Sequence, residues 1–235
     1  MGAPIVNLAT KISLAVQLIT GIFGFYGLAI PLAAKDIILR QVLTLEMVVQ
    51  VIEFIFYVGF LKIFNLTDLT RMRYYDWFMS TPTMLFTISL YFFYVNFIEG
   101  FTDAEKETGV GLEQFVQTNT KEIVAIVILN FLMLLFGFLA EIGMMDRWLA
   151  FALGTGGLLG SFGIIYEKYA KHSEKTRSIF WIMFGLWATY GIAFLLPPVV
   201  KNLSYTTLDI FAKNFFGIFL YFIIRSKAVV PVSNP

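Results

Sequence analysis

The chain has no cysteine, a single histidine and few charged residues for its length. Without cysteine there is no disulfide, no thiol nucleophile and no cysteine-based metal site. His172 lies in a polar stretch, and we interpret it as a surface residue; no metal site is expected. The net charge of +1 provides no strong basic field, so nucleic acid is not an expected partner. Only 14% of the residues are charged and 58% are hydrophobic, too little charge to cover a soluble domain, which predicts a lipid bilayer as the surroundings.

Long apolar stretches account for this excess. A helix needs about 20 mostly apolar residues to cross a bilayer, and helices are expected because lipid offers the backbone no hydrogen-bond partners. The short alternating segments of a membrane barrel do not appear. Seven stretches qualify as spans: 4–32, 41–64, 72–98, 120–144, 146–170, 176–199 and 204–226. The prediction is an all-α membrane protein, a seven-transmembrane-helix bundle with one domain over residues 1–235.

Polar segments separate the spans. The sequence predicts a short turn at Asn65-Leu66-Thr67-Asp68 and a longer acidic loop from Gly100 to Lys121. Pro197-Pro198 is expected to end the sixth span, because proline does not easily continue a helix.

The basic residues predict the orientation in the membrane. The loops after the first, third and fifth spans, with the C-terminus, hold Lys35, Arg40, Lys106, Lys121, Lys168, Lys171, Lys175, Arg177, Arg225 and Lys227. The opposite side holds Lys62, Arg71, Arg147 and Lys201. The first set is richer, which predicts a cytoplasmic C-terminus and an extracellular N-terminus.

Ionisable residues inside a bilayer are energetically expensive and therefore mark functional sites. Five stand out, Glu46, Glu53, Asp76, Asp209 and Lys213, and Arg73 joins them at the expected outer end of the third span. Asp209 and Lys213 are four residues apart and share a helix face. One interpretation is an ion pair that only holds helices together. The other is that the buried lysine condenses with an aldehyde as a Schiff base, whose cationic form needs a buried acid such as Asp76 or Asp209.

Two strings carry a family resemblance. The third span reads Arg73-Tyr74-Tyr75-Asp76-Trp77-Phe78-Met79-Ser80-Thr81-Pro82, and the seventh reads Asp209-Ile210-Phe211-Ala212-Lys213. Together they resemble the microbial rhodopsins, seven-helix retinal proteins of bacteriorhodopsin type, over nearly all seven spans. The resemblance implies all-trans retinal as the cofactor, bound to Lys213 as a Schiff base. It also implies Asp76 and Asp209 as counterions, with Arg73 balancing their charge.

The resemblance extends to the retinal pocket. It implies Trp77 and Trp187 on the two faces of the retinal chain and a hydrogen bond from Tyr190 to Asp209. Taken singly, such aromatic residues are ordinary helix packing. The remaining expected pocket residues are Thr81, Met133, Gly137, Phe151, Gly154 and Leu158. The proline usual in the sixth span is Gly191 here, which removes the usual cause of a kink, although glycine also flexes a helix.

The ion-handling residues favour a channel over a pump. The position that holds the proton donor of a proton pump is Thr87, which does not release a proton at neutral pH. Glu46 and Glu53 are two turns apart, about 10 Å along one helix face. Carboxylates along a pore favour cations. The polar set Ser13, Gln17, Glu46, Glu53, Asp209 and Asn214 is similar to that of the viral rhodopsins of the first group, which are light-gated cation channels.

Alternatives to a channel stay open from the sequence. Ser13, Gln17 and Asn214 are singly compatible with ordinary interhelical hydrogen bonds. The alternatives are a light-driven outward proton pump, a sensory rhodopsin and a transporter without pigment. No enzymatic activity is expected. Relatives form dimers, trimers or pentamers, so a homo-oligomer stays open. A virally encoded protein of this kind is expected in a host-cell membrane.

Overall fold

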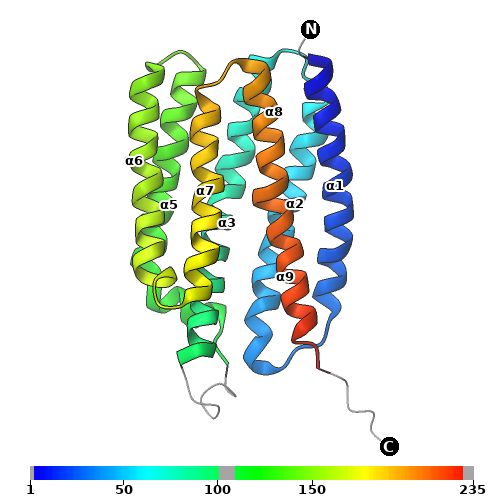
Figure 1. Cartoon of the computed structure of the whole chain (residues 1–235), viewed down its shortest axis with the longest axis vertical. Helices are drawn as coiled ribbons and strands as arrows, with labels where there is room; N and C mark the ends of the chain where they lie inside the picture. Colours follow the sequence, from blue (N-terminus) through cyan, green and yellow to red (C-terminus); the bar gives the residue numbers. More distant parts are fainter. Residues whose placement is uncertain (1–2, 101–108, 230–235) are drawn as a thin grey trace, which may run out of the picture.

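The computed structural model describes residues 3–100 and 109–229 (Figure 1). Within these ranges the chain is helical apart from turns and one isolated β-bridge between Leu32 and Ala228. The helices are α1 (Ala3–Ala29), η1 (Ala34–Asp36), α2 (Ile37–Phe60), α3 (Leu66–Gly100), α5 (Leu112–Glu141), α6 (Arg147–Ile165), η2 (Tyr166–Ala170), α7 (Glu174–Phe194), α8 (Pro198–Asp209), η3 (Ile210–Asn214) and α9 (Phe215–Ser226).

Seven rods run side by side and form the bundle, because α8, η3 and α9 continue one another (Figure 1). Six of the rods are long and apolar enough to cross a membrane. The seventh is α7, which has 21 residues and a charged first turn. The predicted all-α seven-helix membrane fold is therefore confirmed.

Neighbouring rods follow chain order around a ring. In sequence, α1 packs on α2, α2 on α3, α3 on α5, α5 on α6, α6 on α7 and α7 on α8, while α8 and α9 pack back on α1. The start of α1 and the last residues of α9 lie at opposite ends of the bundle (Figure 1). We call these the N-terminal end and the C-terminal end.

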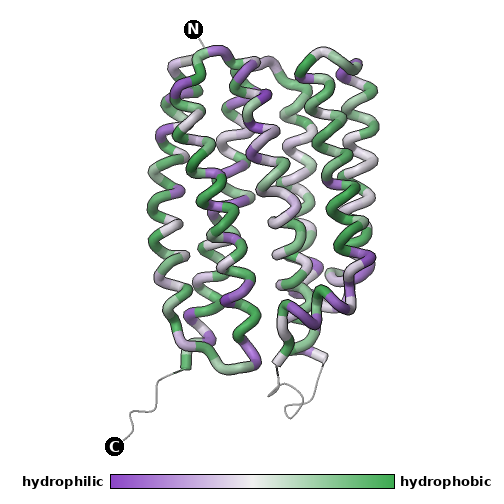
Figure 2. Tube along the Cα trace, turned by 180° about the vertical axis from the view of Figure 1, so that it is seen from behind, coloured by the Kyte–Doolittle hydropathy of each residue, from purple (hydrophilic) through white to green (hydrophobic). Residues whose placement is uncertain are grey.

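Hydrophobic residues run along every rod, with hydrophilic positions scattered among them and gathered at the ends (Figure 2). Large apolar side chains such as Ile22, Phe25 and Tyr26 of α1 are more than half exposed. In a bilayer these side chains contact acyl chains. The polar residues buried inside the bundle are thus shielded from the acyl chains by the helices around them.

Helix boundaries differ from prediction where polar residues begin a helix. The predicted turn at Asn65–Asp68 was wrong, because α3 already begins at Leu66. The Asn65 side chain accepts from the Thr67 and Asp68 backbone N–H groups at 2.9 and 3.4 Å, which is a helix cap. Hydropathy detects the part of a helix within the bilayer and misses its capped polar start.

The predicted acidic loop was also too long at its C-terminal side. Helix α5 begins at Leu112, and its backbone leaves helical geometry at Asn119, with φ −125° and ψ 18°. The predicted span begins one residue later, so the kink separates a polar first segment from the apolar one. Asp103, Glu105, Lys106 and Glu107 lie outside the described residues.

The predicted break at the double proline is present, with Pro197 between α7 and α8 and Pro198 at the start of α8. Helix α7 ends at Phe194, and Pro198 is the first residue of α8. Proline suits the first helical position because its missing N–H would be unpaired there anyway. The last rod thus begins six residues before its predicted start at residue 204.

Candidate functional site

The predicted lysine lies in the centre of the bundle on an irregular stretch of the last rod. Lys213 belongs to η3, a π-helical turn, a form that is rare and often lies at functional sites. Its Nζ donates to Asp76 Oδ2 of α3 at 2.7 Å, and the two side chains are 3% and 0% exposed. Without the other, either charge would be held in an apolar interior at a cost of several kcal/mol.

The second predicted acid has different partners. Asp209 accepts from the hydroxyls of Tyr57 at 2.6 Å and Tyr190 at 2.7 Å, and from Arg73 Nη1 at 3.3 Å. Lys213 is not among its hydrogen-bond partners in the described chain. The structure therefore separates the two acids, with Asp76 in direct contact with the lysine and Asp209 in a network one turn away.

Arg73 organises that network and is completely buried. Its Nε donates to Asn202 Oδ1 at 3.1 Å, Nη2 to Thr206 Oγ1 at 2.6 Å and Nη1 to the Tyr57 hydroxyl at 3.1 Å. The guanidinium also lies 5.1 Å from the centre of the Phe60 ring. Sequence reasoning missed Tyr57, Asn202 and Thr206 as partners of Arg73, because they come from α2 and α8 at positions that no local motif marks.

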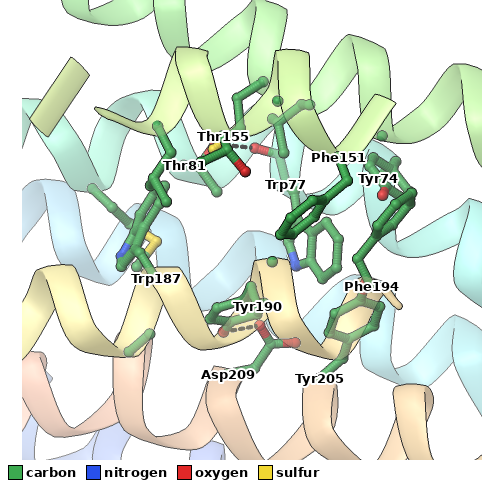
Figure 3. Close-up of a pocket in the computed structure, with 18 of the residues that line it drawn as sticks. Tyr74, Trp77, Thr81, Phe151, Thr155, Trp187, Tyr190, Phe194, Tyr205 and Asp209 are labelled. Carbon is green, nitrogen blue, oxygen red and sulfur yellow. Dashed lines mark hydrogen bonds between the residues drawn. The ribbon is translucent and has the colours of Figure 1, made fainter. Parts of the chain in front are cut away.

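A cavity of about 110 Å³ lies beside Lys213 and is lined by apolar and aromatic side chains from five rods (Figure 3). Trp187 lies toward one end, while Tyr74, Phe151, Phe194 and Tyr205 gather at the other. The predicted pocket residues that line this cavity are Trp77, Thr81, Met133, Gly137, Phe151, Gly154, Leu158, Trp187 and Tyr190.

The cavity has further lining residues that the sequence reasoning did not single out. These are Tyr74, Met84, Leu134, Ala150, Thr155, Phe194, Tyr205 and Ala212. Tyr205 comes one turn before Asp209, and Ala212 immediately precedes Lys213, so proximity to those residues was an available signal. Nothing in the sequence marks Phe194, which reaches the cavity from the last turn of α7.

A glycine and a threonine shape the walls of the cavity. A Cβ at Gly137 would lie 2.6 Å from the Tyr74 hydroxyl oxygen, so only glycine allows Tyr74 its place against the cavity. The Thr81 hydroxyl donates to the Trp77 carbonyl at 2.7 Å and accepts from Asn130 Nδ2 at 2.9 Å. These contacts connect α3 and α5 beside the indole of Trp77.

The chemistry of the cavity fits a long apolar aldehyde. Lys213 supplies an amine at the wall, Asp76 supplies a buried acid beside it, and aromatic rings supply apolar walls. Amines of this kind form Schiff bases with carbonyl compounds. The indole nitrogens of Trp77 and Trp187 are buried and have no hydrogen-bond partner in the described residues.

A second polar cluster lies between α1, α2 and η3. Asn214 Oδ1 accepts from Thr20 Oγ1 at 2.7 Å, and Asn214 Nδ2 donates to Glu53 Oε2 at 3.4 Å. Gln17 Nε2 donates to Ser13 Oγ at 3.2 Å. The predicted residues Ser13, Gln17, Glu53 and Asn214 are thus brought to one region, one residue beyond Lys213.

Two members of this cluster were missed by the sequence reasoning. Gln50 Nε2 donates to the Gln17 carbonyl at 2.7 Å and to Asn214 Oδ1 at 3.3 Å, and it also contacts the Thr20 hydroxyl. Gln50 lies three residues before Glu53, so helical spacing was a usable signal. The amide of Gln50 and the hydroxyl of Thr20 link α1 to α2.

Glu46 lies apart from this cluster. It is 4% exposed, and its carboxyl oxygen is hydrogen-bonded to the Thr87 hydroxyl of α3. The expected path between the first, second and seventh rods therefore includes Glu53, whereas Glu46 faces the third rod, closer to the C-terminal end.

Comparisons with known proteins agree with this geometry. The sequence model of the bacteriorhodopsin-like protein family matches residues 8–227. No curated protein sequence gave a match. Among solved structures, viral rhodopsin OLPVRII superposes with a TM-score of 0.80 at 23% identity, covering 94% of this chain and 98% of that one. Blue light-absorbing proteorhodopsin from Med12 gives 0.69 at 18% identity, covering 94% and 97%. Bromide-bound halorhodopsin from Halobacterium salinarum gives 0.70 at 16%, covering 95% and 96%. At these identities the superpositions show a shared fold.

Proposed function

The chain belongs to the bacteriorhodopsin-like family, whose members bind retinal, and from this we infer that it carries all-trans retinal on Lys213 and acts as a light-gated cation channel. One observation carries the retinal assignment. The Lys213 amine meets the buried Asp76 carboxylate at 2.7 Å on the wall of an aromatic cavity. When bound, retinal supplies absorption of visible light and a rotation about a double bond beside the Lys213 nitrogen.

Asp76 holds the positive charge of the Lys213 nitrogen and is placed to accept its proton. At 2.7 Å the two atoms are already within hydrogen-bond distance, so no rearrangement of the chain precedes the transfer. Once Asp76 is protonated, the ion pair that joins α3 to η3 no longer exists. Loss of one charge pair in a buried network shifts the equilibrium of the bundle from one arrangement of the helices toward another.

The cation path is proposed to run through the polar cluster of Ser13, Gln17, Glu53 and Asn214. Asn214 follows Lys213 directly in η3 and holds Glu53 through its amide. A movement of the lysine backbone therefore shifts Asn214 and releases Glu53. The freed carboxylate favours cations over anions in that path, and Glu46 is proposed as a further point along it.

An outward proton pump is the alternative function. The direct contact between Lys213 and Asp76 is the observation that favours it, because a pump needs proton transfer from the lysine nitrogen to an acid. A sensory role ranks below both. We place the N-terminus outside and the C-terminus in the cytoplasm on the distribution of lysine and arginine. Likeness to viral rhodopsin OLPVRII supports a host-cell membrane as the location if a virus encodes the chain.

The first experiment tests the chromophore. Purified protein is expected to gain a visible absorption band when all-trans retinal is added, because Lys213 then has a covalent partner. Lys213→Ala is expected to form no such band, while Lys168→Ala, which removes a lysine more than half exposed in η2, is expected to form it normally. A band that persists in Lys213→Ala would end the proposal.

The second experiment tests the channel by patch-clamp recording under illumination. A photocurrent that reverses sign with voltage and follows the cation gradient supports the channel, whereas a one-directional current insensitive to that gradient supports the pump. Glu53→Gln is expected to reduce the current at least several-fold, and Glu99→Gln, at an exposed position, is the matched control. If neither kind of current is recorded and the photocycle is slow, the result would support a sensor.

A further inference from the structure

The side-chain amide of Gln50 in α2 has more hydrogen-bond acceptors around it than it has protons. Its Nε2 lies 2.7 Å from the Gln17 carbonyl oxygen and 3.3 Å from Asn214 Oδ1, and it is also within hydrogen-bond distance of Thr20 Oγ1. An amide NH2 group has two protons, so it satisfies at most two of these three oxygens. A backbone carbonyl only accepts, so the atom of Gln50 that meets it is the nitrogen. One partly positive group is therefore surrounded by an excess of oxygen atoms.

The three oxygens also lie close to one another. Thr20 Oγ1 is 2.7 Å from Asn214 Oδ1 and 3.1 Å from the Gln17 carbonyl oxygen. The Thr20 hydroxyl has one proton, so it bridges only one of these two pairs. Thr20 and Asn214 are 4% and 2% exposed, which places the oxygens inside the bundle. The pair that no proton bridges is stabilised by a positive group close to both atoms.

Two further oxygens of the same polar cluster have no donor. Gln17 Oε1 and Glu53 Oε1 are buried and have no hydrogen-bond partner among the described residues. Gln17 instead uses its Nε2, which donates to Ser13. Glu53 uses its other oxygen, which accepts from Asn214 Nδ2. Buried oxygens without a donor are typical of places where a water molecule or an ion binds. Glu53 can supply the negative charge that a cation there requires.

We propose that the three oxygens around the Gln50 amide form a binding site for a monovalent metal cation such as Na⁺ or K⁺, and that the amide occupies this site in the dark. The proposal rests on the channel proposed above and identifies where a permeating cation exchanges water for protein oxygens. Neutral oxygens replace the hydration shell of alkali ions in this way. Calcium sites usually contain several carboxylates, whereas Glu53 is the one acid in contact with this cluster.

The surroundings of Gln50 allow the amide to leave. Asn214 directly follows Lys213 in η3, so a displacement of η3 removes one of the three acceptors of the amide. Gln50 is only partly buried, at the boundary of α1 and α2. A Cβ at the neighbouring Gly21 would lie 3.7 Å from Gln50 Nε2, so this position of α1 does not block the amide. Opening then exchanges hydrogen bonds for cation contacts, and no covalent bond changes.

Thermal unfolding of the full chain in the dark tests the cation site without retinal and without a current. The Tm is measured in NaCl or KCl and in N-methyl-D-glucamine chloride at the same ionic strength, because this organic cation is too large for the site. Gln50→Ala removes the amide and leaves the three oxygens. Alkali ions are expected to raise its Tm in a saturable way, by about 3–6 °C at ten times the dissociation constant. Wild type is expected to respond at least threefold less, because the amide competes for the oxygens.

Two further variants locate the origin of this response. Gln50→Ala combined with Thr20→Val also removes one oxygen ligand and is expected to lose the response. Gln117→Ala removes an exposed amide that donates to Glu113 and is expected to behave like wild type. Equal Tm values of Gln50→Ala in alkali and organic salt would overturn the proposal, because a site that binds only water gives that result. An equal rise in every variant would also overturn it, since it would be an effect of salt in general.

Patch-clamp recording of Gln50→Lys and Gln50→Ala tests the closing role of the amide. Lysine places a permanent positive charge on the same position, so the pigment is expected to form while the photocurrent falls at least fivefold. Gln50→Ala is expected to close at least threefold more slowly after the light is switched off, because no amide returns to the oxygens. Gln117→Lys is the control and should keep the wild-type current. Wild-type currents and closing rates in both Gln50 variants would overturn the closing role. If wild type forms pigment and passes no current, the channel proposal fails and the Tm comparison alone decides the cation site.

Discussion

The buried ion pair at the N-terminal end of the bundle allows a quantitative test of how charges are held in this protein. Lys201 of α8 donates to Glu141 Oε1, at the last residue of α5, at 2.5 Å. Their side chains are only 3% and 7% exposed. The perturbation is Lys201→Met, which keeps the length of the side chain and removes its charge. Glu141 is then left as a buried carboxylate without a cation.

The expected loss of stability follows from this burial. Breaking a buried pair from one side costs about 3–5 kcal/mol, because the remaining charge has lost its water and its partner. For a chain of this size that corresponds to a fall in Tm of about 6–20 °C on the scaling of globular proteins. Lys201→Met combined with Glu141→Leu removes both charges, and replacing a whole buried pair by apolar residues is close to neutral or stabilising.

The assay is thermal unfolding of the purified protein in one detergent, followed by far-ultraviolet circular dichroism at a fixed scan rate. A fixed scan rate is needed because large membrane proteins often unfold irreversibly. Lys171→Met is the matched control, since Lys171 is 43% exposed and its ion-pair partner Glu167 is 63% exposed. Exposed pairs contribute about 0–1 kcal/mol, so this variant should change Tm by no more than about 4 °C.

The double variant decides whether the reasoning holds. If Lys201→Met and the double variant unfold at the same low temperature, the loss would come from packing of the lysine chain. If Lys201→Met unfolds at the wild-type temperature, Glu141 is not a buried charge in the folded protein. Either result would refute the description of this pair as two mutually dependent charges.

Other substitutions test the acid network and the helix packing. Tyr57→Phe removes a 2.6 Å hydrogen bond to Asp209, so it should lower stability by about 1–3 kcal/mol and shift the visible absorption of the pigment, measured by unfolding and spectroscopy. Gly157→Ala places a Cβ 2.7 Å from the Leu129 carbonyl and should lower stability by about 1–3 kcal/mol in the same unfolding assay. Gly156→Ala, where a Cβ meets nothing within 4 Å, should leave stability unchanged or slightly higher; equal losses in both alanine variants would contradict this packing argument.

The sequence predicted the number of rods and the central pair of the site because those features have strong local signals. Twenty apolar residues in a row have one stable solution in lipid, which is a spanning helix. A lysine and an aspartate inside such helices stand out because charges are rare there. Lys213 and Asp76 could therefore be singled out, and the structure brings them to 2.7 Å.

The parts that were missed depend on which helices face each other. The partners of Arg73, including Asn202 and Thr206, are neutral polar residues that look like any surface residue in a sequence. The contact of Glu46 with Thr87 was missed for the same reason, because residues 41 positions apart have no local relation. Helix spacing reveals which residues share a face and does not reveal which neighbour that face meets.

The complete burial of Arg73 has a consequence for how the bundle can move. Its guanidinium holds Tyr57 of α2 and Asn202 of α8 at the same time, and Tyr57 in turn holds Asp209. Hydrogen bonds to charged groups contribute about 1.5–3 kcal/mol each, so separating any one of these three rods must break several together. The halves of α2, α3 and α8 toward the N-terminal end should therefore move as one rigid unit, leaving sliding and tilting to the rods that this arginine does not touch.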